Sequence, residues 1–256
     1  MNRARNIRPR SLQPLSLKCR RLLRRFEICT VASLCLLSFT QCASLKTPST
    51  HHYLHVPFYP QTASQWCWAA GAAMISGYYH SIDSTAKEYS QCDIVRMYYL
   101  NIIRDSSVLG VDCSKLRALK NFGGIPFVVP PHQFYLKGYT ASIQDSALSW
   151  QGLCRQIDAG KPVIFQWDWQ GIDNSLEGGH FMVAEGYSVL PSHHEDSLWV
   201  SVHDPYPANE GKHRIISYRV YNNEVPTNFI GTKARSLERY IYDTHVQDIF
   251  DISRTK

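Results

Sequence analysis

Two residues, 113 positions apart in the chain, have the types and local settings that thiol-based hydrolysis needs. Cys67 lies in QTASQWCWAAGAAM, and His180 lies in EGGHFMVAEGY. Asp204 then ends the apolar run SLWVSVHD. A cysteine becomes an effective nucleophile when a base removes its proton, and the base works best when a third group orients it. The sequence therefore predicts Cys67 as the nucleophile, His180 as the general base and Asp204 as the residue that orients His180.

The residues around Cys67 predict how its thiol would be activated. Four alanines follow it before Tyr79 and there is no proline, which predicts a helix over residues 67–79. Unpaired N–H groups and the positive end of the helix dipole would then face the sulfur and favour the thiolate. The alternative is a buried structural cysteine, which is the common fate of a lone cysteine.

An oxyanion formed by attack on a carbonyl needs hydrogen-bond donors. Gln61, six residues before Cys67, is predicted to donate its side-chain N–H, with the Cys67 backbone N–H as the second donor. Gln65 is the rival because it lies nearer to Cys67, and we expect it to be a loop residue instead. Without a catalytic role, Gln61 would be a solvated turn residue after Pro60.

The chain contains eleven histidines, so the choice of His180 requires an argument. Two glycines before it leave room for a substrate, and it opens an apolar strand that would hold the ring firmly. His193 and His194 lie in a polar loop, and we expect them to face water. His203 is the main competitor, but it adjoins Asp204 and should point to the opposite face of the same strand.

Asp204 also has a simpler interpretation. It precedes a proline, and Asp-Pro pairs often begin turns. Both roles can hold together. Asp168 and Asp173 are weaker candidates for the orienting group.

The order of the predicted elements indicates the fold class. Helices are expected in the first half, over 67–79, 87–104 and 113–122, and a further helix over 150–159 follows, with Ser149 as its N-cap and Gly160 at its C-terminal end. Short β-branched and aromatic runs then alternate with turn residues in PVIFQW, HFMVAEGY, LWVSVHD, RIISYRVY and RYIYD. Helices first and strands later predict an α+β domain of two lobes rather than alternating α/β units. The glycine- and proline-rich stretch 123–138 is expected to connect the two, and residues 207–256 to complete the sheet without contributing chemistry.

The first 46 residues differ from the rest in charge. They hold ten of the 27 lysine and arginine residues and one of the 21 acidic residues. The remainder carries 17 basic and 20 acidic residues, a net charge of −3, and so gives no reason to expect a nucleic-acid partner.

A basic stretch ending at Arg25 and the short apolar run 28–39 form the pattern of an export signal. The following QCAS resembles a bacterial lipoprotein signal, which implies lipidation of Cys42 and membrane attachment. Cleavage after Ala43 without a lipid, or an uncleaved anchor, are the alternatives. We expect an export signal over 1–42, a tether over 43–55 and a catalytic domain over 56–256, located in the cell envelope or secreted.

Four cysteines lie in the catalytic part of the chain. If Cys67 is free, three remain: Cys92, Cys113 and Cys154. One disulfide and one spare thiol is the simplest account, and Cys92–Cys113 is the favoured pair. Three buried free thiols are the alternative.

These residues resemble the papain-like cysteine peptidases. The spacing of Gln61 and Cys67, and Trp68 and Ala69 after the nucleophile, match that family. The flanking sequence is closer to two bacterial branches, the peptidases that process double-glycine leader peptides and the avirulence-effector-type peptidases. Those branches share a Pro-x-x-x-Gln segment before CWAA, the run AGKPV, here 159–163, Gly-Gly-His, and Asp-Pro. The resemblance covers roughly residues 56–206. It implies a papain-like fold, with a helical lobe, an antiparallel β-sheet lobe and the active-site cleft between them.

The expected function is that of an exported cysteine endopeptidase acting as a monomer on a protein or peptide substrate. The same residues would serve an amidase or acyl transferase acting on cell-wall peptides or glutamine side chains, because a fold and a triad do not fix the acyl acceptor. A non-catalytic surface binding protein is the third possibility. The sequence shows no paired metal-ligand spacing and no phosphate-binding glycine loop, so we expect neither a metal nor another cofactor.

Overall fold

The computed structural model describes residues 50–120, 128–129, 133–134, 136–171, 176–190, 197–224 and 240–255. The chain divides into two units, Met1–Pro48 and Ser49–Lys256, and every described residue belongs to the second. The expected export signal, with Cys42, lies outside the described residues. No helix in the described ranges combines the length and apolar character needed to cross a membrane.

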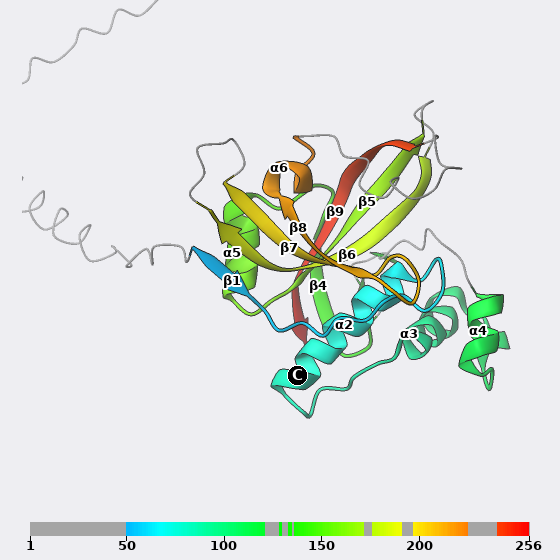
Figure 1. Cartoon of the computed structure of the whole chain (residues 1–256). Coiled ribbons are helices and arrows are strands. Elements are labelled where there is room, and N and C mark those ends of the chain that lie inside the picture. Colours follow the sequence, from blue (N-terminus) through cyan, green and yellow to red (C-terminus); the bar gives the residue numbers. More distant parts are fainter. Residues whose placement is uncertain are drawn as a thin grey trace, which may run out of the picture. The chain divides into compact units, whose positions relative to one another are not determined.

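A seven-stranded antiparallel sheet is the main β-structure of the described residues (Figure 1). Its strand order is β4-β9-β5-β6-β7-β8, and β1 pairs with β6 beside this path. The strands are β1 (His51–Tyr53), β4 (Tyr139–Gln144), β5 (Val163–Gly171), β6 (Leu176–Val189), β7 (Leu198–Asp204), β8 (Lys212–Ser217) and β9 (Tyr240–Arg254). A separate pair, β2 (Val128–Val129) with β3 (Gln133–Phe134), completes the described strands.

The helices differ in how their ends are stabilised. Helix α3 (Gln91–Tyr98) begins with a capping box, in which Ser90 and Asp93 satisfy each other's backbone N–H groups, and a π-helical turn over Tyr99–Ile103 continues it. The remaining α-helices are α2 (Cys67–Ile82), α4 (Cys113–Leu119), α5 (Trp150–Asp158) and α6 (Tyr218–Tyr221), and a 3-10 turn spans Ser106–Val108. Cys92 and Cys113 form a disulfide that joins α3 to α4, with their Cα atoms 5.8 Å apart, as predicted. Cys67 and Cys154 are free and buried.

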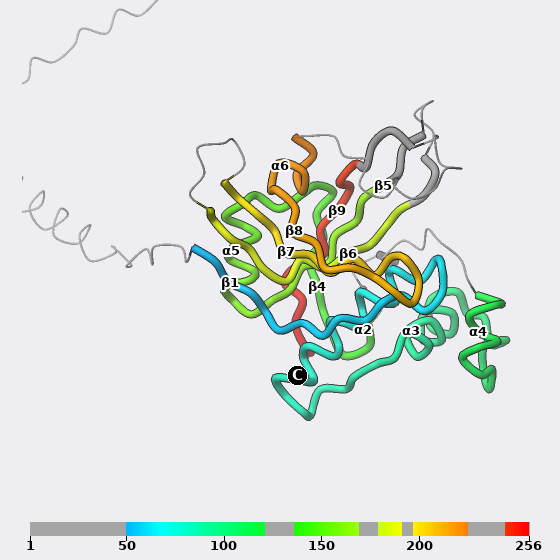
Figure 2. The backbone as a smooth tube through the Cα atoms, in the orientation of Figure 1, coloured from blue at the N-terminus to red at the C-terminus, as the bar shows by residue number. Residues whose placement is uncertain are grey.

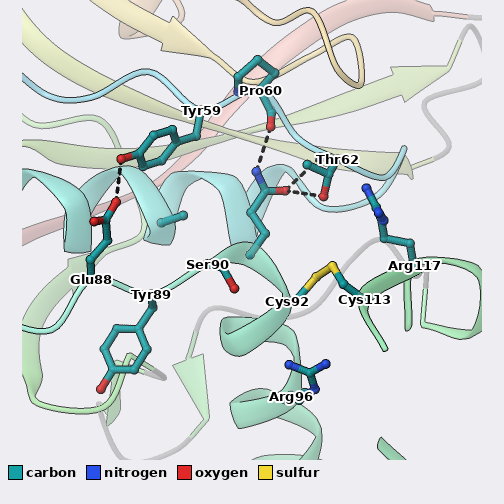
Figure 3. A pocket seen from close by; sticks show the side chains of 12 residues that line it. Tyr59, Pro60, Thr62, Glu88, Tyr89, Ser90, Cys92, Arg96, Cys113 and Arg117 are labelled. Atoms are coloured by element: carbon teal, nitrogen blue, oxygen red, sulfur yellow. Dashed lines mark hydrogen bonds between the residues drawn. A yellow bond between two sulfur atoms is a disulfide. The ribbon is translucent and has the colours of Figure 1, made fainter. Parts of the chain in front are cut away.

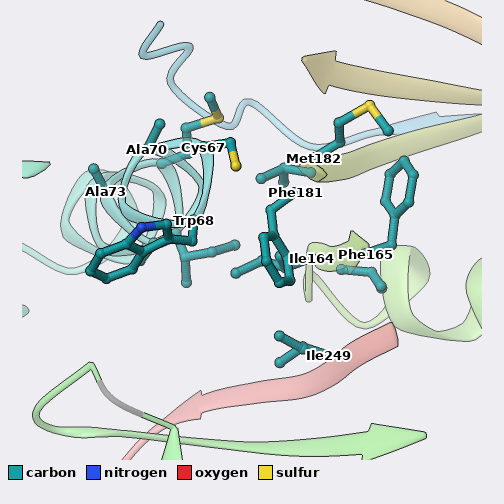
Figure 4. Close-up of a cluster of buried hydrophobic side chains, with 14 of the residues drawn as sticks. Cys67, Trp68, Ala70, Ala73, Ile164, Phe165, Phe181, Met182 and Ile249 are labelled. Carbon is teal, nitrogen blue, oxygen red and sulfur yellow. The ribbon is translucent and has the colours of Figure 1, made fainter. Parts of the chain in front are cut away.

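Helix α2 packs on the sheet through small side chains. Gly71 illustrates how close the approach is, because a Cβ placed there would lie 3.6 Å from Val183 and 3.9 Å from Ile164. Figure 4 shows this part of the core, where Trp68 and the alanines of α2 meet Phe181 and Ile164. Segment 54–66 passes along α2 before entering it (Figure 2), and Pro57 contacts the helix at Gly77. Helix α2 therefore lies close against β6 at Gly71.

The predicted α+β class is confirmed, and most predicted elements are found near their expected positions. Helix α5 has Ser149 as its N-cap, accepting a hydrogen bond from the Gly152 N–H, and Gly160 follows its end with φ of +71°. The run RIISYRVY is a strand only to Ser217. The Ser217 side chain then accepts a hydrogen bond from the Val220 N–H and begins α6 instead.

Three further segments need comparison with the predicted elements. His51–Tyr53, within the range expected to be a tether, pair with β6 as β1. Strand β4, which has no counterpart among the predicted strands, pairs with β9. Most of the expected connection over 123–138 lies outside the described residues.

Candidate active site

Cys67 is the first residue of α2, as the sequence predicts. The N-cap residue is Trp66, and no side chain caps this end of the helix. No acidic residue lies in the first turn. The positive end of the helix dipole therefore acts at Cys67 without a competing carboxylate from the helix itself. The thiol is buried, and Figure 4 shows it on the side of the helix that faces β6.

His180 and Asp204 come together because β6 and β7 are neighbours in the sheet. Nε2 of His180 lies 2.7 Å from Oδ1 of Asp204, and both side chains are buried. A second hydrogen bond joins the side chains of His180 and Cys67. Since Nε2 is engaged by Asp204, Nδ1 is the ring nitrogen left for the thiol. The structure thus brings together the three residues predicted from sequence in the order thiol, imidazole, carboxylate.

Asp204 has two further partners that were not predicted from the sequence. Nε of Arg214 on β8 donates a hydrogen bond to Oδ2 of Asp204 at 2.6 Å. The Tyr206 backbone N–H donates to Oδ1 at 2.9 Å. Residues 207–256 were expected to contribute no chemistry, so Arg214 is a correction to that expectation. No local sequence motif indicates this role, because it depends on the pairing of β8 with β7.

These contacts set the charge of the histidine. Burial alone would lower the pKa of His180, because it disfavours the charged imidazolium. The charge and hydrogen bond of Asp204, with smaller contributions from Cys67, more than offset this and raise the pKa to about 10. Burial would raise the pKa of Asp204, but His180, Arg214 and the Tyr206 N–H lower it below its ordinary value. The site therefore favours an imidazolium beside a carboxylate at neutral pH.

Gln61 is buried and lies in the loop before α2. Its backbone N–H donates to the Pro205 carbonyl at 3.0 Å, and its own carbonyl accepts from the Asn209 N–H at 2.8 Å. This loop is thus tied to the residues that follow Asp204. The side-chain Nε2 donates to the carbonyls of Ala63 at 3.0 Å and Ser64 at 2.7 Å. The amide must turn from at least one of them to reach an oxyanion, so its donor role stays a prediction.

The rival residues occupy other settings. His203 lies 2.8 Å from a Glu185 oxygen rather than beside Asp204, as the strand alternation predicts. Gln65 is exposed. Asp168 is half-buried and accepts a hydrogen bond from Gln166, and burial raises its pKa above the ordinary value. His193, His194 and Asp173 lie outside the described residues.

A cavity of about 770 Å³ lies beside the loop of Gln61, between that loop and α3 (Figure 3). The catalytic candidates Cys67, His180 and Asp204 are not among its lining residues. Gln91 of α3 lines it and donates to the Pro60 carbonyl at 2.8 Å. It also accepts from the Thr62 backbone N–H at 2.9 Å. Gln91 therefore holds both neighbours of Gln61, a supporting role that no local sequence motif signals.

Cys67 lies at a helix N-terminus and is hydrogen-bonded to His180, which the buried Asp204 carboxylate orients. Cysteine-dependent hydrolases have this arrangement. The model of the Peptidase_C39 like family matches residues 53–228. The chain belongs to that family and is a cysteine peptidase. The predicted papain-like class is thereby confirmed, whereas its relation to the two bacterial branches stays a prediction.

Among solved structures, the chain is similar to xylellain, a cysteine protease from Xylella fastidiosa. The two share 14% sequence identity with a TM-score of 0.42. The match covers 82% of this chain and 88% of that one. No curated protein matches the chain at a significant level.

Proposed function

We propose that this protein is an exported endopeptidase that hydrolyses peptide bonds through an acyl-enzyme on Cys67. The observation that carries the proposal is the buried contact of 2.7 Å between His180 Nε2 and Asp204 Oδ1. It fixes the imidazole with its other nitrogen toward the thiol, which is the geometry that a general base needs.

Before acylation, the proton of the Cys67 thiol has been transferred to His180. The thiolate attacks the carbonyl carbon of the scissile bond, and the carbonyl oxygen becomes an oxyanion. The backbone N–H of Cys67 and the turned side chain of Gln61 donate to it. When this intermediate collapses, the C–N bond breaks, and the leaving amine takes the proton from His180.

Deacylation reverses the role of His180. The neutral imidazole removes a proton from water, and the resulting hydroxide attacks the thioester carbonyl. The C–S bond then breaks, the acid product leaves, and the thiolate is restored beside the imidazolium. Asp204 stabilises the imidazolium whenever it forms and keeps the ring from rotating.

Two features support export. The first is the leader, whose basic segment, short apolar run and Cys42 follow the pattern of a secreted lipoprotein. The second is the disulfide between Cys92 and Cys113. Structural disulfides form and persist mainly in oxidising compartments. We therefore place the enzyme in the cell envelope, attached through a lipid on Cys42, or secreted.

A thiol-directed epoxide inhibitor tests the nucleophile, and Cys154 serves as an internal control. Both cysteines are buried and free, but burial and the nearby Asp158 raise the pKa of Cys154 to about 12. Of the two free cysteines in the described residues, only Cys67 should react at neutral pH, and mass spectrometry of the digested adduct will locate it. Labelling of Cys154 alone, or of neither residue, would contradict the assignment of Cys67.

A separate comparison of substrates is needed to find which acyl group the thiolate of Cys67 attacks. The purified enzyme should be offered casein, cross-linked peptidoglycan fragments and a glutamine donor with an amine acceptor. Casein cleavage is expected, and it should disappear in the Cys67→Ala variant. Turnover of the peptidoglycan fragments alone would favour the amidase alternative, and amine incorporation would favour the acyl transferase.

A further inference from the structure

Three ligand-type side chains meet on strands β6, β7 and β8, away from the contacts of Asp204. They are Glu185, His203 and His213, and one ligand atom from each lies within 4.8 Å of the others. Nε2 of His203 is 2.8 Å from Oε1 of Glu185, and Nδ1 of His213 is 3.9 Å from the same oxygen. We propose that these residues form a binding site for a divalent transition-metal ion of the zinc type.

The strand register builds this cluster. His203 and His213 are directly paired across β7 and β8, so their side chains leave the sheet on the same face. Glu185 lies where the register of β6 against β7 shifts between Ala184 and Gly186. Such a bulge re-aims a side chain, and here it directs the Glu185 carboxylate to the histidines.

The buried imidazole of His203 makes no hydrogen bond to the described residues. The ring is 1% exposed, yet neither nitrogen has a hydrogen-bond partner among the described residues. Nε2 is within ion-pair distance of Glu185, but the direction of the contact does not make a hydrogen bond. A buried polar atom without a partner is unfavourable, and a metal ion would accept the nitrogen lone pair.

The surroundings match a three-ligand site with an open position. Two histidines and a carboxylate are ligands that zinc takes at about 2.0–2.2 Å, often with water as the fourth ligand. The side chain of His213 is 62% exposed, so it can adjust and leaves a route from solvent. Ser201 donates a hydrogen bond to Glu185 Oε1 at 3.1 Å and would orient the carboxylate. The Phe58 ring packs against both imidazoles, with centroid distances of 5.2 and 4.6 Å.

The position of the cluster links it to the active site. His203 immediately precedes Asp204, and His213 immediately precedes Arg214. Successive side chains of a strand alternate between faces, so the metal would bind on the face opposite the pair Asp204–Arg214. It would hold β7 and β8 in register at the residues that support His180. The ion therefore has a stabilising role and does not take part in peptide hydrolysis.

Zinc binding to the full-length, tag-free protein tests the proposal. The Cys67→Ala background removes the thiol and so prevents zinc from binding at the catalytic cysteine. Bound zinc should be measured by equilibrium dialysis and elemental analysis in this background, and again with His213→Ala added. His55→Ala is the matched control, because His55 is also exposed and lies outside the cluster.

We expect His213→Ala to lose one equivalent of zinc, while His55→Ala keeps it. Zinc should also raise the Tm of the background and of the His55 variant, but not that of the His213 variant. Ser201→Ala should weaken zinc binding by about tenfold or more. Equal zinc binding by the His213 and His55 variants would overturn the proposal. So would the absence of bound zinc in the background, since Glu185 and His203 would then be an ion pair only.

Discussion

Arg214 and His180 each hold one oxygen of the Asp204 carboxylate. Nε of Arg214 lies 2.6 Å from Oδ2, and Nε2 of His180 lies 2.7 Å from Oδ1. The carboxylate is buried, and the arginine is its second positive partner. Arg214 thus positions Asp204, which in turn orients the imidazole of His180.

Replacing Arg214 with alanine should lower both stability and activity. The buried carboxylate would lose a charged partner, and breaking such a pair costs about 3 kcal/mol or more. Because Arg214 lowers the pKa of Asp204, its loss should also move the acidic limb of the kcat/KM profile to higher pH. Chemical denaturation and the pH profile measure the two effects. Lys212→Ala is the control, since Lys212 is an exposed cation on the same strand. An unchanged acidic limb would show that Arg214 acts only on stability.

Gln61→Ala should reduce kcat by about 100-fold or more, as expected for loss of an oxyanion donor. KM should change little, because the donor acts mainly on the transition state. The matched control is Gln65→Ala, which removes an exposed glutamine from the same loop. Steady-state kinetics on one peptide substrate compare the two. Equal losses in both variants would mean that Gln61 only maintains the loop.

The stability of the folded protein should decline at alkaline pH. The pKa of His180 is raised to about 10 by Asp204 and Cys67, against an ordinary value of about 6.5. The histidine therefore adds stability that is fully present below about pH 6.5 and is lost as the pH rises through about 10. Urea unfolding of the wild type and of His180→Gln measures this contribution as their difference. A difference that stays constant over that range would contradict the raised pKa.

Removing the disulfide should destabilise the helical part of the protein. Cys92 and Cys113 are 21 residues apart, and a loop of this size corresponds to about 3 kcal/mol. The double variant Cys92→Ala/Cys113→Ala should unfold at lower denaturant concentration than the wild type. Reductant should shift the wild type to the same midpoint and leave the variant unchanged. Coincident midpoints without reductant would show that the bridge contributes nothing to stability.

Cys42→Ser should abolish lipid attachment when the full chain is expressed in a bacterial host. Metabolic labelling with a radioactive fatty acid, followed by membrane fractionation, measures this directly. Cys35→Ser is the control, because Cys35 lies within the apolar run rather than at the expected cleavage site. If both variants keep the label, another residue carries the lipid. If the wild type takes up none, the leader is not a lipoprotein signal.

Helix α2 and the position of Cys67 at its start could be predicted because their signals are local. An alanine-rich run without proline predicts α2, and Cys67 at its start follows from the order of residues. The alternation of side chains along β7 likewise places His203 and Asp204 on opposite faces, which needs no knowledge of distant segments. The disulfide partner was only favoured from sequence, because pairing depends on distances that the sequence does not contain.

The supporting contacts depended on strand order and register. Arg214 reaches Asp204 because β8 pairs with β7, and Gln91 holds the loop of Gln61 because α3 packs beside that loop. The cluster of Glu185, His203 and His213 also requires a bulge in β6, which has no short sequence motif. The sequence by itself therefore determined which residues could do chemistry and which helix presents the thiol. Only the tertiary structure decided which charges face one another, because those contacts join segments that are distant in the chain.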